Sequence, residues 1–426
     1  MQLVSRQSRL AGEVLIPASK SHTIRAVAIA ALAEGQSLIH NPLWSGDAEA
    51  AVRSYRALGA QIDTSDPNLW KICGIGGRIA PPEQTIDVGN SGTTLRIAMG
   101  SAALASEGQA TTFTGDEQIR SRPVGPLLNA LEDLGASCDS LAGNGKAPVR
   151  IAGTLKGGTT SIEAKTSQYL TSLLMCAPLA SGDTEIDVTL LNEPGYVQMT
   201  LDWLDKQGIA YEHEKMRRFR VQGRQLYKPF DLPVPADFSS ATFFLCAAAL
   251  FGDEVVLKGL DFADSQPDKA VVEYLRAMGA DITIDANGIR VHAAPLHGVE
   301  IDMNATPDAL PAMAVTAAFA EGTTRLVNVA QARVKETDRI TCMAQELEKL
   351  SGKIEELPDG LIVHGGGLRA GPVHGRDDHR IVMALALAGL GLDEPITIET
   401  AQAMAVTFPD FVTLMQSLGA DMQLAD

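Results

Sequence analysis

A short phrase recurs six times along this chain and constrains its fold more than any other feature. In each copy a bulky residue precedes small residues around a glycine, and a β-prone residue follows. The copies begin at Leu58, Leu134, Gln207, Met278, Leu350 and Leu418. Their glycines lie 67 to 76 residues apart, which is too regular for chance and too long for a solenoid repeat. The chain is therefore predicted to consist of six repeats of one fold unit.

Each copy of the phrase follows a run with helical periodicity, such as Ala48 to Leu58, and precedes a short β-prone run. This order predicts a helix that ends at a glycine C-cap and turns into a strand. Alanine-rich runs between the copies predict a second helix in each unit. Because one unit cannot bury all its apolar residues, six units predict two domains of three, with a crossing expected at Pro233-Val234-Pro235.

The composition is typical of a soluble enzyme with two cores. The chain has 426 residues, 45% of them hydrophobic and 20% charged, and this length predicts two domains. The sequence shows neither a long uninterrupted apolar stretch nor a secretory leader, so a cytoplasmic protein is expected. The five cysteines are odd in number and scattered among apolar residues, which favours buried thiols over disulfides or a metal site.

Basic residues are concentrated in a few short segments although the chain is acidic. The formal net charge of −17 disfavours nucleic acid or an anionic membrane as a partner. The basic segments lie at predicted loop-to-helix junctions, and their cations are Lys20, Arg25, Arg96, Arg120, Arg122, Arg333, Lys335, Arg339, Arg376 and Arg380. Each one alone is explained by an ordinary surface charge. As a group they indicate a small, highly anionic ligand.

Two of these segments are typical of a helix start that binds an anion. Ser19-Lys20-Ser21 precedes an alanine-rich run, where free backbone N–H groups and the helix dipole attract negative charge. Gly89 to Arg96 places two glycines and two threonines after a predicted strand, so that the backbone can approach a ligand closely. This second segment matches neither a Walker motif nor a dinucleotide fingerprint. A plain serine cap is the simpler alternative for the first segment.

The second half of the chain carries two further charged segments. Arg333 to Arg339 contains three cations and two carboxylates, and on a helix it would form a solvated ion-pair face with Glu336 and Arg339 as neighbours. Asp378-His379-Arg380 opens an apolar helix, where a histidine and an arginine could hold a phosphate and manage a proton. The simpler alternative is that the acidic residues there balance the helix dipole.

Seven motifs follow one another in a specific order: Ser19-Lys20-Ser21 with Arg25, Gly89-Asn90-Ser91-Gly92-Thr93, Arg122-Pro123, Ser167-Gln168, Arg333 to Arg339, Asp378-His379-Arg380 and Thr407-Phe408-Pro409-Asp410. From about residue 10 to residue 415 the chain thereby resembles the 5-enolpyruvylshikimate-3-phosphate (EPSP) synthases, or 3-phosphoshikimate 1-carboxyvinyltransferases, of the enolpyruvyl transferase family. The resemblance implies an α/β (α+β) fold of six βαβαββ units in two pseudo-threefold domains, an inside-out α/β barrel. It implies an N-terminal lobe of residues 18–234, a C-terminal lobe of residues 1–17 plus 235–426, and an active site in the interdomain cleft.

The resemblance also implies a reaction. The enolpyruvyl group of phosphoenolpyruvate would be transferred to the 5-hydroxyl of shikimate 3-phosphate by addition and elimination, with release of phosphate and with no metal or organic cofactor. This is a step of the shikimate pathway, which leads to chorismate and the aromatic amino acids. A monomer that binds these two small molecules, and neither nucleic acid nor a membrane, is expected. Glyphosate is expected to compete with phosphoenolpyruvate.

Site residues are carried over from the family by position. Phosphoenolpyruvate would be bound by Lys20, Gly92, Arg122, Arg339 and Arg380. Shikimate 3-phosphate would be bound by Ser21, Arg25, Thr166, Ser167, Gln168, Tyr196, Asp308, Gln331 and Lys335. The catalytic residues would be Asp308, which accepts the hydroxyl proton, Glu336 and Lys20, which handle the proton at the methylene carbon, and His379, which assists at the phosphoenolpyruvate site.

Three positions depart from the family pattern. Glu193 stands where many members have a serine that meets the substrate phosphate, and its carboxylate would repel that phosphate unless it faces away or pairs with Lys165. Gln331 replaces an asparagine that contacts the shikimate ring, and Val406 replaces a lysine on the phosphoenolpyruvate side. The sequence leaves open whether Glu193 and Val406 change the acceptor or the sensitivity to glyphosate.

Three other functions compete with the transferase interpretation. The sister transferase acting on UDP-N-acetylglucosamine typically has Asn after the lysine and a cysteine in the Arg120 loop, whereas here Ser21 follows Lys20 and that loop has no cysteine. A paralogue of the same fold could act on another cyclohexene acid. A non-catalytic anion-binding protein is disfavoured because both acid–base candidates, Asp308 and Glu336, are present.

Overall fold

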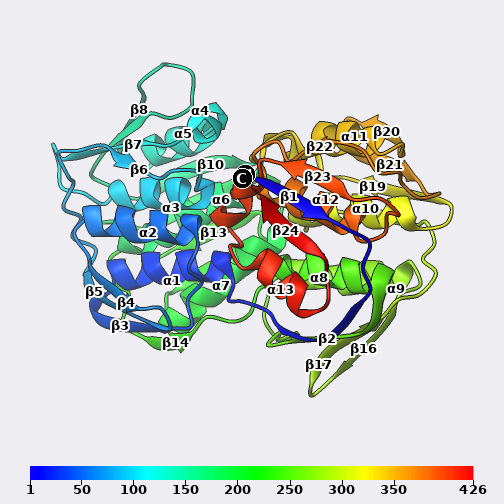
Figure 1. Ribbon diagram of the computed structural model, residues 1–426. Helices are drawn as coiled ribbons and strands as arrows, with labels where there is room; N and C mark the ends of the chain where they lie inside the picture. The colour runs from blue at the N-terminus through cyan, green and yellow to red at the C-terminus, as the bar shows by residue number, and fades with distance from the viewer. Residues whose placement is uncertain (426) are drawn as a thin grey trace. The chain divides into compact units, whose positions relative to one another are not determined.

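The computed structural model describes residues 1–425, and the chain divides into two compact units. Unit 1 consists of Met1–Pro17 and Pro235–Asp426, and unit 2 of Ala18–Val234 (Figure 1). Each unit has its own hydrophobic core. Among the helices formed by residues 1–425, none is both long and apolar enough to cross a membrane.

Unit 2 is built from three four-stranded sheets and the helices that they enclose. Its helices are α1 (Lys20–Leu32), α2 (Gly46–Ala57), α3 (Gly92–Ala102), α4 (Glu117–Ser121), α5 (Gly125–Asp133), α6 (Ser167–Cys176), the short η1 (Ala177–Leu179) and α7 (Pro194–Gln207). Its strands are β3 (Glu34–His40), β4 (Gln61–Asp66), β5 (Leu69–Ile75), β6 (Ile86–Asp87), β7 (Ala110–Thr114), β8 (Ser137–Ser140), β9 (Val149–Ala152), β10 (Gly158–Ala164), β11 (Thr184–Leu191), β12 (Tyr211–Glu214), β13 (Arg218–Val221) and β14 (Asp231–Pro233). The sheet orders are β14-β3-β5-β4, β6-β7-β9-β8 and β10-β11-β13-β12.

Unit 1 repeats this arrangement. Its α-helices are α8 (Phe238–Phe251), α9 (Ala270–Ala277), α10 (Leu310–Phe319), α11 (Arg339–Lys349), α12 (His379–Gly389) and α13 (Phe411–Ser417), and its 3-10 turns are η2 (Pro267–Lys269), η3 (Pro307–Ala309), η4 (Ala330–Val334) and η5 (Ala401–Val406). Its strands are β1 (Gln2–Ser5), β2 (Leu10–Leu15), β15 (Gly252–Lys258), β16 (Asp281–Asp285), β17 (Gly288–His292), β18 (Glu300–Asp302), β19 (Thr323–Val327), β20 (Lys353–Leu357), β21 (Gly360–His364), β22 (Val373–His374), β23 (Ile396–Glu399) and β24 (Met422–Ala425). The sheet orders are β16-β17-β15-β2, β18-β19-β21-β20 and β22-β23-β1-β24.

The six sheets share one topology, which confirms the predicted sixfold repeat. In each sheet one edge strand pairs in parallel with its neighbour, as β10 does with β11 and β2 with β15, and the remaining pairs are antiparallel. Strands distant in sequence complete three of the sheets. The N-terminal β2 pairs with β15, β1 lies between β23 and β24, and β14 pairs with β3. Residues 1–17 are therefore an integral part of unit 1.

The recurring phrase forms the turn between a helix and a strand in every unit. In five copies its glycine has a left-handed φ of 68° to 112°, which glycine adopts without steric penalty: Gly59, Gly135, Gly208, Gly279 and Gly419. In the fifth of the six copies Ser351 takes this conformation instead, with φ 65°. Gly352 is needed there for a different reason, because a Cβ at this position would lie 2.8 Å from the Leu347 carbonyl oxygen.

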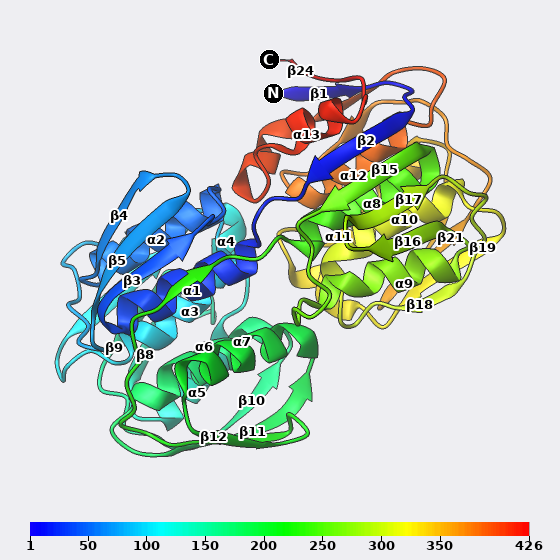
Figure 2. The same cartoon turned by 90° about the horizontal axis from the view of Figure 1, so that it is seen from below.

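Three helices in each unit are buried almost all round, and four of these six, α1, α3, α6 and α12, begin at one of the sequence motifs. The six helices are α1, α3 and α6 in unit 2 and α8, α10 and α12 in unit 1. Within each unit the sheets lie outside these helices (Figure 2). Such helices read as apolar on every side because no face meets water. Polar residues lie at the starts of these helices and, in Arg25 of α1 and Arg96 of α3, about one turn further in.

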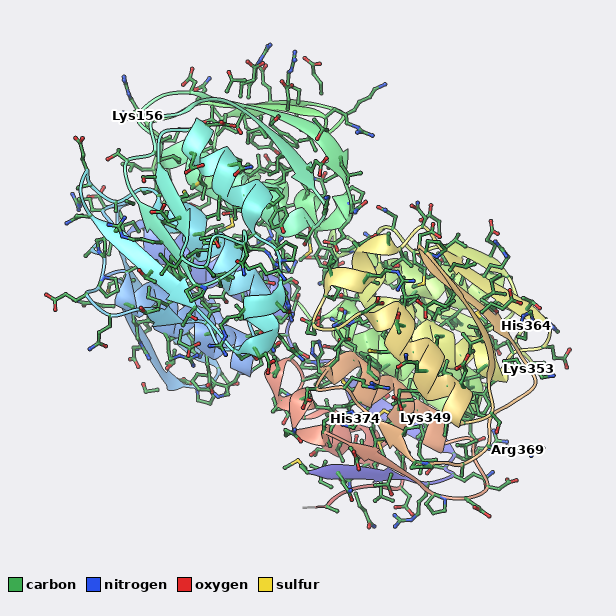
Figure 3. All side chains as sticks on the ribbon, turned by 90° about the horizontal axis from the view of Figure 1, so that it is seen from above. Lys156, Lys349, Lys353, His364, Arg369 and His374 are labelled. Carbon is green, nitrogen blue, oxygen red and sulfur yellow. The ribbon has the colours of Figure 1, made fainter. Side chains whose placement is uncertain are left out.

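Several residues that lie away from these helix starts are on the surface or have a structural role. Lys353 and His364 face each other across the outer β20–β21 pair, and Lys353 is exposed (Figure 3).

Cys138, Cys176 and Cys246 are buried, and burial raises the pKa of each thiol to about 12. Cys73 and Cys342 are half-buried and free. Burial also raises the pKa of Cys342, so the thiols of Cys138, Cys176, Cys246 and Cys342 are not in the ionised state that a nucleophile requires at neutral pH.

Candidate active site

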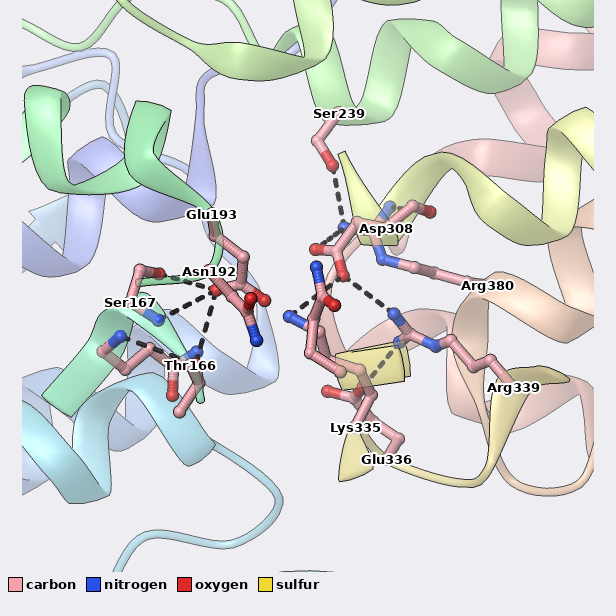
Figure 4. Close-up of polar contacts among 12 residues, drawn as sticks. Thr166, Ser167, Asn192, Glu193, Ser239, Asp308, Lys335, Glu336, Arg339 and Arg380 are labelled. Carbon is pink, nitrogen blue, oxygen red and sulfur yellow. Dashed lines mark hydrogen bonds and ion pairs between the residues drawn. The ribbon is translucent and has the colours of Figure 1, made fainter. Parts of the chain in front are cut away.

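Asp308 is at the centre of a cluster of charged side chains in unit 1. It lies in η3, directly before the buried α10. Its Oδ1 is 2.8 Å from Arg339 Nη1, its Oδ2 is 3.0 Å from Arg380 Nη2, and Lys335 Nζ lies 3.7 Å from Oδ1 (Figure 4). Burial opposes ionisation, but the three cations outweigh it and hold the pKa of the Asp308 carboxyl well below its ordinary value. Asp308 is therefore a carboxylate at physiological pH.

Arg339 links Asp308 to two other carboxylates. Its side chain is 1% exposed, its Nε donates to Asp378 Oδ2 at 2.8 Å, and its Nη2 donates to Glu336. Burial alone would lower the pKa of this guanidinium, but Asp378, Glu336 and Asp308 raise it above its ordinary value. We call Asp308, Lys335, Glu336, Arg339, Asp378 and Arg380 the acid–arginine cluster.

The segment from Arg333 to Arg339 is not the helix with a solvated ion-pair face that its spacing predicts. The turn η4 ends at Val334 and α11 begins at Arg339. The reason is a cap: Asp338 Oδ1 accepts a hydrogen bond from Thr341 N at 3.0 Å and so starts the helix after itself. Lys335 and Glu336 consequently lie on a loop, and Arg339 points inward to the cluster.

The start of α12 supplies the remaining members of the cluster. Asp378 caps the helix by accepting from Arg380 N at 2.9 Å, and Arg380 Nη2 donates to Ser239 Oγ at 2.8 Å. His379 is 2% exposed, and burial lowers its pKa to about 3. His379 is therefore a neutral imidazole at physiological pH. It can donate or accept a hydrogen bond, but it brings no positive charge to a phosphate.

Gln331 lies on η4, beside the cluster in sequence. Its side chain is buried, and its Nε2 donates to the Asn304 carbonyl oxygen at 2.9 Å. The longer side chain thus reaches backbone of the loop before η3, which carries Asp308. This contact supports the loop.

In unit 2 the start of α1 carries two cations, Lys20 and Arg25, whose partners differ in charge. Lys20 Nζ is 3.0 Å from Asp47 Oδ2. Arg25 is buried, and its guanidinium donates only to neutral acceptors: the hydroxyls of Thr200 and Thr171 and the carbonyl oxygens of Ser21 and Tyr196. Burial lowers its pKa to about 10, so the side chain stays charged. A buried cation held by neutral groups favours an anionic ligand nearby.

The starts of α3 and α6 are joined to each other. Gln168 Nε2 donates to Thr93 Oγ1 at 3.0 Å, and Arg96 Nη1 donates to Gln168 Oε1 at 2.7 Å. A side chain at Gly92 would displace guanidinium groups, since a Cβ there would lie 2.6 Å from Arg96 Nη1 and 2.7 Å from Arg122 Nη1. Two guanidinium tips therefore converge on the backbone at the start of α3. We call Lys20, Arg25, Arg96 and Arg122 the cations of the helix starts.

Glu193 reaches the start of α6. Its Oε2 accepts hydrogen bonds from Ser167 Oγ at 2.7 Å and from Ser167 N at 3.1 Å (Figure 4). Lys165 pairs with Glu163 rather than with Glu193, with Nζ 3.1 Å from Oε2. The carboxylate therefore faces a residue expected to bind substrate, and it takes neither of the two arrangements, facing away or pairing with Lys165, that would avoid repulsion of the phosphate.

Sequence reasoning missed three partners in these clusters. Asp378 was named only as part of a motif and as a residue that balances a helix dipole, and Arg96 was named only among the cations that indicate an anionic ligand. Asp47, the partner of Lys20, was not singled out, although an acidic residue in the first turn of a predicted helix is a signal that could have found it. The structure brings Asp308, Glu336, Lys335, Arg339 and Arg380 together in one cluster, and their roles toward substrates stay predictions.

Comparisons with known proteins agree with this geometry. Residues 4–415 match the family model described as EPSP synthase (3-phosphoshikimate 1-carboxyvinyltransferase). The 3-phosphoshikimate 1-carboxyvinyltransferases of Acetivibrio thermocellus and Ruminiclostridium cellulolyticum are each 50% identical to this chain, over 100% of both proteins. The solved EPSP synthase of Acinetobacter baumannii has a TM-score of 0.84 at 27% identity and covers 100% of each chain. The chain therefore belongs to the EPSP synthase family, the 3-phosphoshikimate 1-carboxyvinyltransferases.

Proposed function

We propose that the acid–arginine cluster and the cations of the helix starts act on one pair of substrates, phosphoenolpyruvate and shikimate 3-phosphate. The activity of the chain is 3-phosphoshikimate 1-carboxyvinyl transfer, a step of the shikimate pathway. The two groups of residues differ in their electrostatic surroundings, and this difference supports different roles for them. Arg25 is a buried cation held by neutral acceptors, whereas Arg339 is matched by three carboxylates. The first arrangement suits anion binding, and the second suits proton transfer.

Shikimate 3-phosphate would be held mainly by hydroxyl and amide groups at the helix starts, together with two cations. Its binding residues are Ser21, Arg25, Thr166, Ser167, Gln168, Tyr196, Gln331 and Lys335. Phosphoenolpyruvate, which carries a phosphate and a carboxylate, would be bound by Lys20, Gly92, Arg122, Arg339 and Arg380. Guanidinium forks bind both anionic groups through paired hydrogen bonds. The convergence of Arg96 and Arg122 on Gly92 supports this assignment.

The reaction needs one base and one acid. In the addition step the 5-hydroxyl oxygen bonds to C2 of phosphoenolpyruvate, Asp308 takes the hydroxyl proton, and the methylene carbon gains a proton from Glu336 or Lys20. In the elimination step that carbon loses a proton and the bond from C2 to the phosphate oxygen breaks, which releases phosphate. His379 assists as a neutral hydrogen-bonding group, since its pKa is about 3.

Asp308 is a weak base while both arginines contact it, because they hold its pKa well below the ordinary value. Phosphoenolpyruvate would attract Arg339 and Arg380 to its own anionic groups. Removing positive charge from Asp308 raises the pKa of its carboxyl and makes it a stronger base. Substrate binding would thereby activate the base that the transfer requires.

Mass spectrometry of the products tests the proposal. The purified chain is mixed with phosphoenolpyruvate and either shikimate 3-phosphate or unphosphorylated shikimate. We expect the phosphorylated acceptor to become heavier by one enolpyruvyl group. A product from another cyclohexene acid alone would instead support a paralogue with a different acceptor, the alternative that the position of Glu193 favours.

We also propose that the chain acts as a monomer in the cytoplasm, without a cofactor, and that the two substrates are its only required partners. Support comes from the cores, each of which is completed by residues of a single chain. Light scattering at micromolar concentration should give the mass of one chain, 45.1 kDa. A dimer mass would contradict the monomer proposal.

A further inference from the structure

We infer that Glu193 is a resident anion at the start of α6, which the phosphate of the acceptor has to displace. This inference rests on the proposed function, in which Thr166, Ser167 and Gln168 bind shikimate 3-phosphate. It adds a determinant of acceptor affinity that is specific to a chain with a carboxylate at this position. Its consequence is weaker binding of the phosphorylated acceptor than the same site would show with a neutral residue.

The contacts of Glu193 are those that a phosphate oxygen would make. One carboxylate oxygen, Oε2, accepts from the backbone N–H and from the hydroxyl of Ser167, and lies 3.4 Å from Thr166 Oγ1. Ser167 is the first residue of α6, a helix of ten residues, and Thr166 is its cap. Unpaired N–H groups and hydroxyls at a helix start are strong donors for an anion. Here the anion is a side chain of the same protein.

The backbone fixes this position of the carboxylate. Glu193 has left-handed dihedral angles, φ 57° and ψ 48°, at the residue before α7. Residues other than glycine rarely adopt this backbone conformation. Pro194 follows as the first residue of α7, and the Glu193 carbonyl oxygen accepts from Tyr196 N at 3.1 Å. The direction in which Glu193 leaves the main chain is therefore set by the helix.

The electrostatics of the site make the carboxylate a competitor. The side chain of Glu193 is buried, with 1% of the residue exposed, and the nearby Lys165 is engaged by Glu163. A phosphate that binds the Ser167 donors would meet a second negative charge within a few ångströms, where like charges repel strongly. Glu193 must then leave its donors, and the loss of these contacts makes binding of the phosphate less favourable. An acceptor without a phosphate leaves the Glu193 contacts intact.

Two substitutions at Glu193 test the inference. Glu193→Gln removes the charge and keeps an oxygen that can accept from Ser167, and Glu193→Ser removes the long side chain altogether. Glu107→Gln is the matched control, because Glu107 is an exposed residue in the turn after α3. The readouts are KM and Kd for shikimate 3-phosphate, KM for phosphoenolpyruvate and Kd for unphosphorylated shikimate, with thermal unfolding as a check of folding.

We expect both Glu193 variants to lower KM and Kd for shikimate 3-phosphate about tenfold. KM for phosphoenolpyruvate and Kd for shikimate should stay as in the wild type, and Glu107→Gln should change none of the four constants. An unchanged or raised Kd for shikimate 3-phosphate in the folded variants would overturn the inference. Equal tightening of shikimate would overturn it as well, because the effect would not depend on the phosphate.

The outcome separates this inference from the proposed function. If the proposed function were wrong, the wild type itself would fail to bind shikimate 3-phosphate and to make the enolpyruvyl product. If only the inference is wrong, the wild type makes the product and the Glu193 variants bind the acceptor no more tightly. If one variant does not fold, the other variant still tests the inference, because Gln keeps the size of the side chain and Ser shortens it.

Discussion

Arg339 Nη1 lies 2.8 Å from Asp308 Oδ1, so that an arginine expected to bind phosphoenolpyruvate contacts the carboxylate expected to act as the base. Arg380, Lys335 and Arg339 together outweigh burial and lower the pKa of Asp308, which keeps it ionised and weakly basic in the absence of substrate. The contact between Asp308 and Arg339 also compensates the charge of an arginine whose side chain is 1% exposed. The same contact thus stabilises the fold and holds the base inactive until an anion arrives.

The first prediction concerns His379 and the acid side of the stability profile. Its pKa is lowered from 6.5 to about 3 in the folded chain, so only the unfolded chain takes up this proton between those values. Stability should therefore fall as the pH decreases below about 6.5, by roughly 2 kcal/mol at pH 5 for this one group. Thermal unfolding of His379→Gln between pH 7 and pH 5 should show a smaller loss than the wild type. His364→Gln, at a partly exposed histidine, should behave as the wild type does; equal pH dependence in all three chains would contradict the prediction.

The second prediction concerns Arg333, which holds the loop that carries Lys335 and Glu336. Arg333 donates to Asp338 at 2.7 Å, to Glu356 at 2.9 Å and to the Leu357 carbonyl oxygen at 2.7 Å. Arg333→Gln should lower kcat roughly 10- to 100-fold because the acid–base groups lose their position. Arg333→Lys should recover part of that loss.

The control for Arg333 is Arg325→Gln, which removes an exposed ion pair with Glu300 on the sheet surface. Steady-state kinetics of the three variants distinguish a positioning role from a general loss of stability. If Arg325→Gln and Arg333→Gln reduce kcat equally, Arg333 does not position the loop.

The third prediction concerns Gly92. A Cβ at this position would lie 2.6 Å and 2.7 Å from the guanidinium tips of Arg96 and Arg122, so Gly92→Ala must push one or both away. KM for phosphoenolpyruvate should rise about tenfold or more, with a smaller change in KM for shikimate 3-phosphate. Gly125→Ala is the control, because its Cβ would meet its nearest neighbour at an ordinary 3.8 Å. Unchanged kinetics in Gly92→Ala would show that these arginine tips do not bind the substrate.

Much of the fold could be predicted from the sequence because it is repeated. Six copies of one turn predict six equivalent units, and the shared topology of the six sheets confirms this. Three of the motifs were also predicted at helix starts, which is where the structure has Ser19, Ser91 and Asp378 as caps. These features are local, since a cap and its helix lie within a few residues of each other.

The remaining features depend on contacts between residues distant in sequence. Glu193 contacts Ser167, which lies 26 residues away in the sequence, and no local sequence pattern predicts that contact. The segment from Lys335 to Asp338 has charges at helical spacing, yet the cap at Asp338 starts the helix later and turns Arg339 inward. In the fifth copy of the repeat, Ser351 takes the left-handed conformation because Gly352 is needed for a close approach to Leu347.

The measurement that tests the account most directly is release of inorganic phosphate by the wild type and by Asp308→Asn, each given phosphoenolpyruvate and shikimate 3-phosphate. Asn has the shape of Asp308 but cannot accept the hydroxyl proton. The account predicts rapid release by the wild type and a rate about 10²- to 10⁴-fold lower for the variant, with binding of shikimate 3-phosphate retained. No release by the wild type, or a variant rate within threefold of it, would contradict the role of Asp308 as the base.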